Sequence, residues 1–227
     1  MQREKTRDMI LCAMFVVLIG AGAFIKIPVP VVPFTLQYLF TMLAGLLLGP
    51  RLGALSVAVY VLLGLVGLPI FAQGGGVGYV FQPSFGYLLG FILGAWITGT
   101  IARRGRSLPS MGRLLGANLA GLAAVYLCGM AYCWVVTNYY LDTPMGLWPL
   151  VLYCFLLAVP GDLFLCVVGA MAGRRLLPLV GRETERSREH GHGTNAGGQG
   201  SGGGEADPAG GGDAVSAALG QAVPKGR

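Results

Sequence analysis

Six apolar segments, joined by short connections, constrain the fold of this chain more than any other feature. Charged residues make up only 11% of the sequence, whereas a soluble globular domain carries roughly 25%. Segments of this composition are expected to be solvated by lipid, so we predict an all-α integral membrane protein with six transmembrane helices. The predicted helices cover approximately residues 9–25, 34–48, 52–66, 84–102, 114–136 and 148–173.

The last part of the chain has a different composition. From Gly181 onward it is rich in Gly, Ser, Glu and Arg, has no aromatic residue and contains one leucine, Leu219. A segment of this kind cannot bury a hydrophobic core. We therefore predict a transmembrane domain over residues 1–180 and a disordered, Gly/Ser-rich cytoplasmic tail over residues 181–227.

The basic residues indicate how the helices are oriented. Six spans place both termini on one side of the membrane, and the basic residues that flank the spans fall on that side, with Lys26 as the exception. By the positive-inside rule both termini are then cytoplasmic. Because the basic residues flank the spans on one side, the net charge of +6 indicates membrane topology and not nucleic-acid binding. The basic residues counted are Arg3, Lys5, Arg7, Arg51, Arg103, Arg104, Arg106, Arg113, Arg174 and Arg175.

Three connections with little or no charge are then expected to meet at the outer face. The first, Ile27 to Gln37, has three prolines and must be extended, because each proline removes a backbone donor and fixes φ. The second, Gly67 to Phe91, reads GLPIFAQGGGVGYVFQPSFGYLLGF, and the third covers residues 138–147.

The composition of the second connection suits a concave site for a mostly apolar small molecule. It suits equally a loop that rests on the membrane interface, where Tyr and Phe are common. Its polar side chains are Gln73 and Gln82, and its aromatic ones are Phe71, Tyr79, Phe81, Phe85 and Tyr87.

Asp162 is the only acidic residue within an apolar segment. A charge at the middle of a membrane helix costs roughly 2.5–3.5 kcal/mol on insertion scales, so this carboxylate should face the bundle interior or an aqueous pocket. Pro160 either kinks one long helix or opens the last helix. In the second case Asp162 lies in the first turn, where it either stabilises the helix terminus or accepts hydrogen bonds from a ligand.

The sequence argues against an enzyme. The membrane part has no histidine and no paired carboxylates at helical spacing, and the five cysteines lie inside apolar segments without CxxC spacing. GGGVG lacks the strand and helix of a dinucleotide site, and there is no GxxxxGK[ST] motif. We expect no metal and no cofactor. Gly86, Gly90 and Gly94 repeat every fourth residue, which predicts a helix-packing seam.

Three stretches resemble BioY, the biotin-binding substrate component (S-component) of energy-coupling-factor (ECF) transporters. They are IPVPVVPFTLQ, LAGLLLGPRLGALSVAVYVLLGLVGLPIFAQGGGVGYVFQPSFGYLLGF and PGDLFLCVVGA, and the likeness spans Ala13 to Leu177. The resemblance implies a six-helix bundle of the ECF S-component type in the cytoplasmic membrane of a prokaryote. It also implies high-affinity biotin capture from the outer face, with a transmembrane coupling protein and two ATP-hydrolysing subunits as partners.

Biotin has an apolar fused ring, and its ureido group has two N–H donors and one carbonyl. Asp162 would accept an N–H, while a glutamine would serve the carbonyl and aromatic rings would stack on the ring system. The expected binding residues are Gln37, Phe71, Gln73, Gly75, Tyr79, Gln82, Tyr87 and Asp162, with Phe81 among the stacking rings.

The sequence departs from the family pattern at two places. Leu165 stands where many members carry lysine, so the partner of the biotin carboxylate is Lys26, Asn138 or a backbone amide. The first helix has Ala13 and Val17 in place of Ala-x-x-x-Ala, which only partly supports docking to the coupling protein. The alternative function is a stand-alone secondary carrier for biotin or another small vitamin, for which one intramembrane aspartate is thin support.

Overall fold

The computed structural model describes residues 2–27, 34–104, 109–141 and 146–193. The chain divides into two units, Met1–Arg186 and Ser187–Arg227. The first unit is a helical bundle, and it contains every feature discussed below. The remaining tail, 194–227, lies outside the described residues, as does Asp142.

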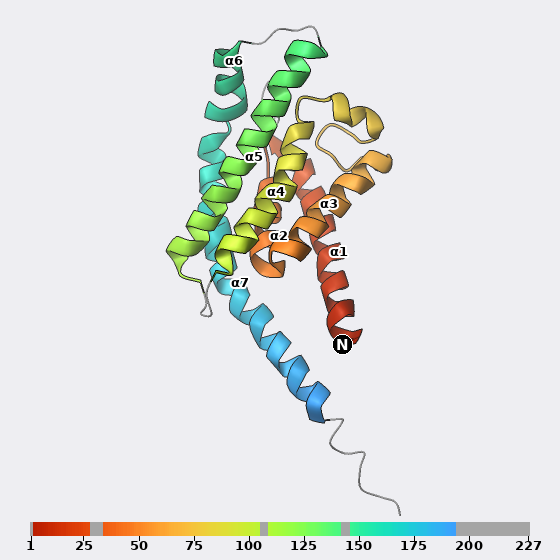
Figure 1. Ribbon diagram of the computed structural model, residues 1–227, viewed down its shortest axis with the longest axis vertical. Helices are drawn as coiled ribbons and strands as arrows, with labels where there is room; N and C mark the ends of the chain where they lie inside the picture. The colour runs from red at the N-terminus through yellow and green to blue at the C-terminus, as the bar shows by residue number, and fades with distance from the viewer. Residues whose placement is uncertain (1, 28–33, 105–108, 142–145, 194–227) are drawn as a thin grey trace, which may run out of the picture. The chain divides into compact units, whose positions relative to one another are not determined.

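Each predicted apolar segment corresponds to helical structure (Figure 1). The helices are α1 (Gln2–Phe24), α2 (Gln37–Leu48), α3 (Pro50–Val66), α4 (Phe85–Ala102), α5 (Met111–Tyr139), α6 (Leu147–Val151) and α7 (Val159–Gly193). Within the described residues, α1, α4, α5 and the stretch Trp148–Pro178 are long and apolar enough to cross a membrane. The prediction of a six-helix membrane bundle is confirmed, and α7 continues past residue 180, where we predicted the tail to begin.

Helix α2 is shorter than the segment predicted for it, and the extended stretch before it explains why. β1 (Lys26–Ile27) pairs antiparallel with β2 (Phe34–Thr35), and α2 begins only at Gln37. At 1.5 Å per residue, its 12 residues span about 18 Å, less than the roughly 30 Å of a hydrocarbon core. The predicted extended conformation is confirmed at Ile27 and at Phe34–Thr35, whereas Gln37 at the end of the stretch already belongs to α2. The prolines at 28, 30 and 33 lie outside the described residues.

The glycine ladder forms the predicted seam between α4 and α5. A Cβ at Gly86 would collide with Tyr132, and one at Gly90 would lie 2.9 Å from the Cα and the carbonyl oxygen of Val125. A Cβ at Gly94 would also contact Val125. The bare stripe therefore lets the two helix backbones approach closely, as small residues do in membrane bundles.

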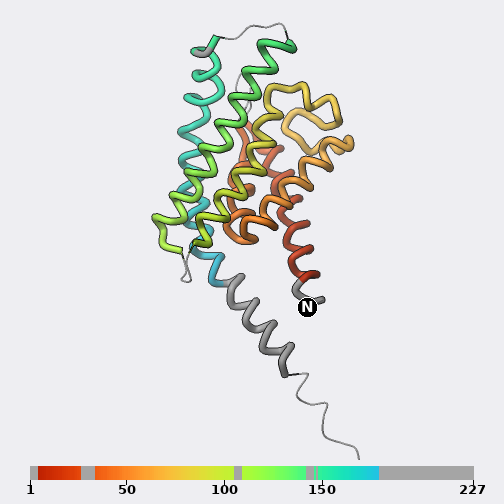
Figure 2. Tube along the Cα trace, viewed as in Figure 1, coloured from red at the N-terminus to blue at the C-terminus, as the bar shows by residue number. Residues whose placement is uncertain are grey.

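The last apolar segment agrees with the second interpretation offered for Pro160, in which this residue opens the last helix. After α6, the π-helix η2 (Leu152–Leu156) interrupts the α-helical pattern, and α7 begins at Val159 with Pro160 as its second residue. Proline is tolerated there because its missing N–H belongs to the unpaired first turn. Figure 2 shows this segment running beside α5. The break places Asp162 in the first turn of α7.

The connection between α3 and α4 folds as a tight loop that ends in the 3-10 helix η1 (Val77–Phe81). Phe71 and Gly74 exchange backbone hydrogen bonds of 2.9 and 3.2 Å, and the Gly76 N–H donates to the Gly64 carbonyl at 2.7 Å. Gly74 and Gly76 have φ of 117° and 101°, a conformation that other residues rarely adopt. Glycines at these positions therefore set the path of the loop.

Candidate functional site

A cavity lies where β2, the glycine-rich loop and helices α2, α4, α5 and α7 meet. Its volume, measured as the space open to the centres of water molecules, is about 70 Å³. One water needs roughly 10–15 Å³ on this measure, so the cavity is larger than a packing defect. It is lined by Phe34, Thr35, Gln37, Tyr38, Ala72, Tyr79, Ser84, Tyr87, Leu88, Phe91, Leu122, Val125, Tyr126, Tyr153, Cys154, Ala158 and Asp162.

Among the described residues, Asp162 is the one charged side chain that lines this cavity. Its Oδ2 accepts a hydrogen bond of 2.5 Å from the hydroxyl of Tyr126, which projects from the middle of α5. Hydrogen bonds to an ionised acceptor are stronger than neutral ones, so this contact fixes the orientation of the carboxylate. Because Tyr126 occupies one oxygen, the other oxygen is left to accept from a ligand.

Gln37 supplies a second polar group. It is the first residue of α2, its side chain is only 3% exposed, and it lines the same cavity. Its Nε2 is buried and makes no hydrogen bond of good geometry among the described residues, although the Tyr60 hydroxyl lies near enough to interact with the Gln37 side chain. An unpaired buried donor costs about 1–3 kcal/mol, so a ligand that brings an acceptor to this nitrogen would recover that free energy.

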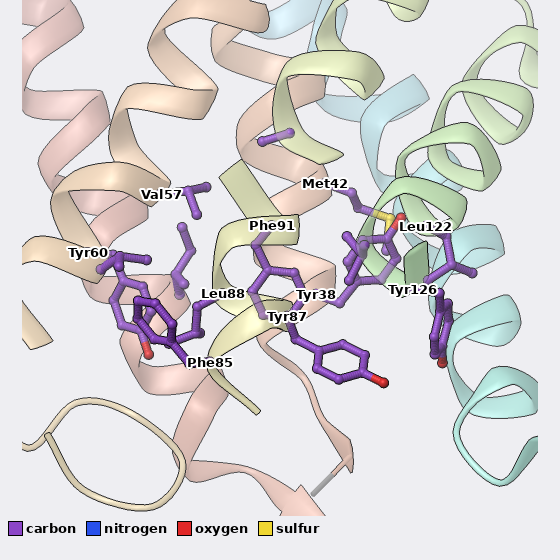
Figure 3. Close-up of a cluster of buried hydrophobic side chains, with 14 of the residues drawn as sticks. Tyr38, Met42, Val57, Tyr60, Phe85, Tyr87, Leu88, Phe91, Leu122 and Tyr126 are labelled. Carbon is purple, nitrogen blue, oxygen red and sulfur yellow. The ribbon is translucent and has the colours of Figure 1, made fainter. Parts of the chain in front are cut away.

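Aromatic rings also line the cavity, and Figure 3 shows four of them, Tyr38, Tyr87, Phe91 and Tyr126. Tyr87 meets Tyr126 edge to face at 6.1 Å, and Tyr38 stacks on Phe91 at 6.1 Å. The hydroxyl of Tyr87 donates to the carbonyl of Cys154 at 3.1 Å, and that of Tyr38 donates to the carbonyl of Asn118 at 2.7 Å. These bonds hold the rings in place, so the cavity is formed before any ligand enters.

The glycine-rich loop contributes Ala72 and Tyr79 to the cavity. Tyr79 is 5% exposed, and its hydroxyl shares a 3.2 Å hydrogen bond with that of Ser84. Burial raises the pKa of Tyr79, so its hydroxyl remains protonated. A second contact ties the loop to α5, because the Tyr132 hydroxyl donates to the carbonyl of Val80.

Half of the predicted binding residues lie at the cavity: Gln37, Tyr79, Tyr87 and Asp162. The other four, Phe71, Gln73, Gly75 and Gln82, do not line it.

Phe71 lies beneath the loop. Its ring contacts Tyr60 at 5.6 Å and Tyr79 at 4.5 Å, and it fills the space left by Gly64. This residue anchors the loop to α3 and positions Tyr79.

The exposed side of the loop carries the remaining candidates. Gln73, Gly75 and Gln82 are exposed. Phe81 is 49% exposed and stacks on Tyr140 at 4.5 Å, so its ring packs on the end of α5 and not in the cavity.

Sequence reasoning missed Tyr38 and Tyr126, which both line the cavity. Tyr126 lies in the middle of an apolar segment, and a tyrosine hydroxyl at such a depth needs a partner. Asp162 is a lone aspartate elsewhere in the membrane part. The need of the Tyr126 hydroxyl for a partner was therefore the signal that could have linked Tyr126 to Asp162.

The described residues include no group of three side chains suited to hold a metal ion. The cysteines are free thiols, and the Sγ atoms of Cys133 and Cys154 are 3.8 Å apart. Hydrogen-bonding groups, one carboxylate and aromatic surface are therefore what the cavity offers to a ligand.

A model of the BioY family matches residues 1–182. The chain is 42% identical over 176 residues to a probable biotin transporter BioY of Lysinibacillus sphaericus, covering 78% of this chain and 89% of that protein. It is 39% identical to the biotin transporter BioY of Thermotoga maritima, covering 79% and 99%. The crystal structure of an S-component for biotin from an ECF-type ABC transporter matches with a TM-score of 0.65 and 25% identity, covering 78% and 93%.

Proposed function

The chain belongs to the BioY family, and we propose that it binds biotin in the cavity described above as the substrate-specific subunit of an ECF-type importer. The observation that carries this proposal is the pairing of two unused hydrogen-bonding groups in one aromatic cavity. These are the free oxygen of Asp162 and the unpaired Nε2 of Gln37.

The two groups complement a ureido ring. Asp162 accepts one ureido N–H in a charge-assisted bond, which is worth about 1.5–3 kcal/mol. Gln37 donates to the ureido carbonyl and thereby gains the partner that it lacks in the unliganded protein. Tyr126 acts as a positioning residue, because it holds the carboxylate in the orientation that meets the ligand.

The apolar part of biotin is expected to contact the ring faces of Tyr79 and Tyr87, which line the cavity. Ligand sites of this kind combine mostly apolar walls with a few well-placed polar groups. Phe71, Gln73, Gly75 and Gln82 contribute indirectly, since they belong to the loop that carries Tyr79 and Ala72 over the cavity.

Binding is tested on the purified protein in detergent by calorimetric titration with biotin, desthiobiotin, thiamine and riboflavin. We expect tight binding of biotin and no binding of thiamine or riboflavin. Desthiobiotin keeps the ureido group and should therefore bind detectably. Failure to bind biotin, or a preference for thiamine or riboflavin, would refute the proposal.

If import is driven by ATP hydrolysis, the motor must be a partner, because the sequence has no GxxxxGK[ST] motif. We expect a transmembrane coupling protein and two ATPase subunits, and orientation with both termini in the cytoplasm. Cysteines placed at Gln73 and Arg104 test the orientation in intact cells. An impermeant thiol reagent should label the Gln73→Cys variant and not the Arg104→Cys variant; the reverse pattern would contradict it.

A further inference from the structure

The charge distribution around the cavity indicates where the far end of the ligand lies. Asp162 lines the cavity, and no basic side chain among the described residues does so. Biotin also ends in a carboxylate, and two like charges repel strongly at short range in a medium of low dielectric constant. The ligand carboxylate must therefore lie away from Asp162 and toward solvent.

Lys26 is the cation at the rim of this cavity. Its Nζ donates a 2.6 Å hydrogen bond to the carbonyl of Ala72, which lines the cavity. Its backbone also lies opposite Thr35 in the β1–β2 pair, and Thr35 lines the cavity as well. The strand pairing thus places the backbone of Lys26 beside one lining residue, and the hydrogen bond holds its exposed ammonium group beside another.

The other candidates for the carboxylate partner are placed elsewhere. The Nδ2 of Asn138 donates to the Trp134 carbonyl at 2.9 Å, and Asn138 does not line the cavity. Leu165 is buried in the core with 6% exposure and offers no polar group. Lys26 is therefore the side chain in the described structure that combines positive charge with a position at the rim.

We propose that Lys26 binds the carboxylate of the ligand and selects the free acid over neutral derivatives of biotin. This assignment rests on the proposed function. An ammonium group has three donors, of which Ala72 uses one, so two remain for a carboxylate. The contact with Ala72 also holds the flexible lysine stem, which lowers the entropic cost of forming the ion pair.

The test compares biotin with biotin methyl ester, which keeps the ureido ring and lacks the charge. Calorimetry is performed on the wild-type protein and on Lys26→Met, Lys26→Arg and Lys5→Met. Lys5 is a matched control, because it is an exposed lysine near the start of α1, whereas Lys26 lies in β1, just after the end of that helix. The affinity for the ester reports whether each variant is folded.

We expect the wild-type protein to bind biotin several-fold more tightly than the ester, with a preference that falls as salt is added. Lys26→Met should bind both ligands with the ester's affinity, whereas Lys26→Arg and Lys5→Met should keep the preference. Equal affinities in the wild-type protein, or an unchanged preference in Lys26→Met, would overturn the role of Lys26 alone. Binding of neither ligand by the wild-type protein would overturn the proposed function itself.

Discussion

Asp162→Asn tests the contact on which ligand recognition depends, and the structure predicts which way the new amide will face. The Tyr126 hydroxyl donates to Oδ2 of Asp162 at 2.5 Å. In the variant this hydroxyl still needs an acceptor, and only the amide oxygen can provide one. The Nδ2 group is therefore turned toward the cavity, where it meets a ureido N–H, so that two donors face each other.

The expected loss follows from the bond that is removed. A hydrogen bond to a charged group contributes about 1.5–3 kcal/mol, and about 1.4 kcal/mol corresponds to a tenfold change in Kd. The variant should therefore bind biotin about 10- to 150-fold more weakly. Its thermal unfolding should change little, because the Tyr126 hydroxyl keeps an acceptor.

A double variant separates this explanation from a general loss of structure. In Asp162→Asn combined with Tyr126→Phe, the amide is free to rotate and to present its oxygen to the ligand. We expect this protein to bind biotin more tightly than Asp162→Asn alone in calorimetric titrations. Gln82→Ala, an exposed change outside the cavity, serves as the control. Wild-type affinity in Asp162→Asn would refute the reasoning.

Three further changes test other parts of the structure. Gln37→Met should weaken biotin binding by about 5- to 150-fold, because the ligand no longer recovers the about 1–3 kcal/mol that the unpaired donor costs, and it should stabilise the unliganded protein because that donor disappears; equal affinity would exclude Gln37 from the site. Phe71→Ala should cost about 3–5 kcal/mol of unfolding free energy, seen as a lower unfolding temperature; a neutral effect would show that the ring does not anchor the loop. Gly90→Ala should lower the unfolding temperature, because its Cβ would lie 2.9 Å from the backbone of Val125. Gly116→Ala, with open space around it, is the control and should not lower it. Equal effects of the two changes would contradict the close packing of α4 on α5.

Most of the fold could be predicted from the sequence because lipid imposes simple requirements on composition and length. The apolar segments gave α3, α4 and α5 nearly to their ends. The start of α2 was predicted less well, because Phe34 and Thr35 belong both to the predicted helix 34–48 and to the stretch Ile27 to Gln37 that was predicted to be extended; they pair with β1. The π-helix before α7 was also invisible, because its residues have the same composition as an α-helix.

The candidate site was predictable where a polar residue interrupts an apolar context, as Asp162 and Gln37 do. The glycine-rich loop was less predictable, because which of its side chains faces inward depends on backbone turns. Gln73 is exposed, whereas Tyr79 of the same loop lines the cavity. Tyr126 was missed because a tyrosine within an apolar helix suits a lipid contact as well as a partner in the bundle.

A crystal structure of the protein with bound biotin tests the central claim most directly. We predict a ureido nitrogen at about 2.9 Å from the carboxylate of Asp162, the ureido oxygen at Nε2 of Gln37, and the ligand carboxylate at Lys26. Biotin bound with its ureido ring away from Asp162, or outside the cavity between β2, α4, α5 and α7, would contradict the account.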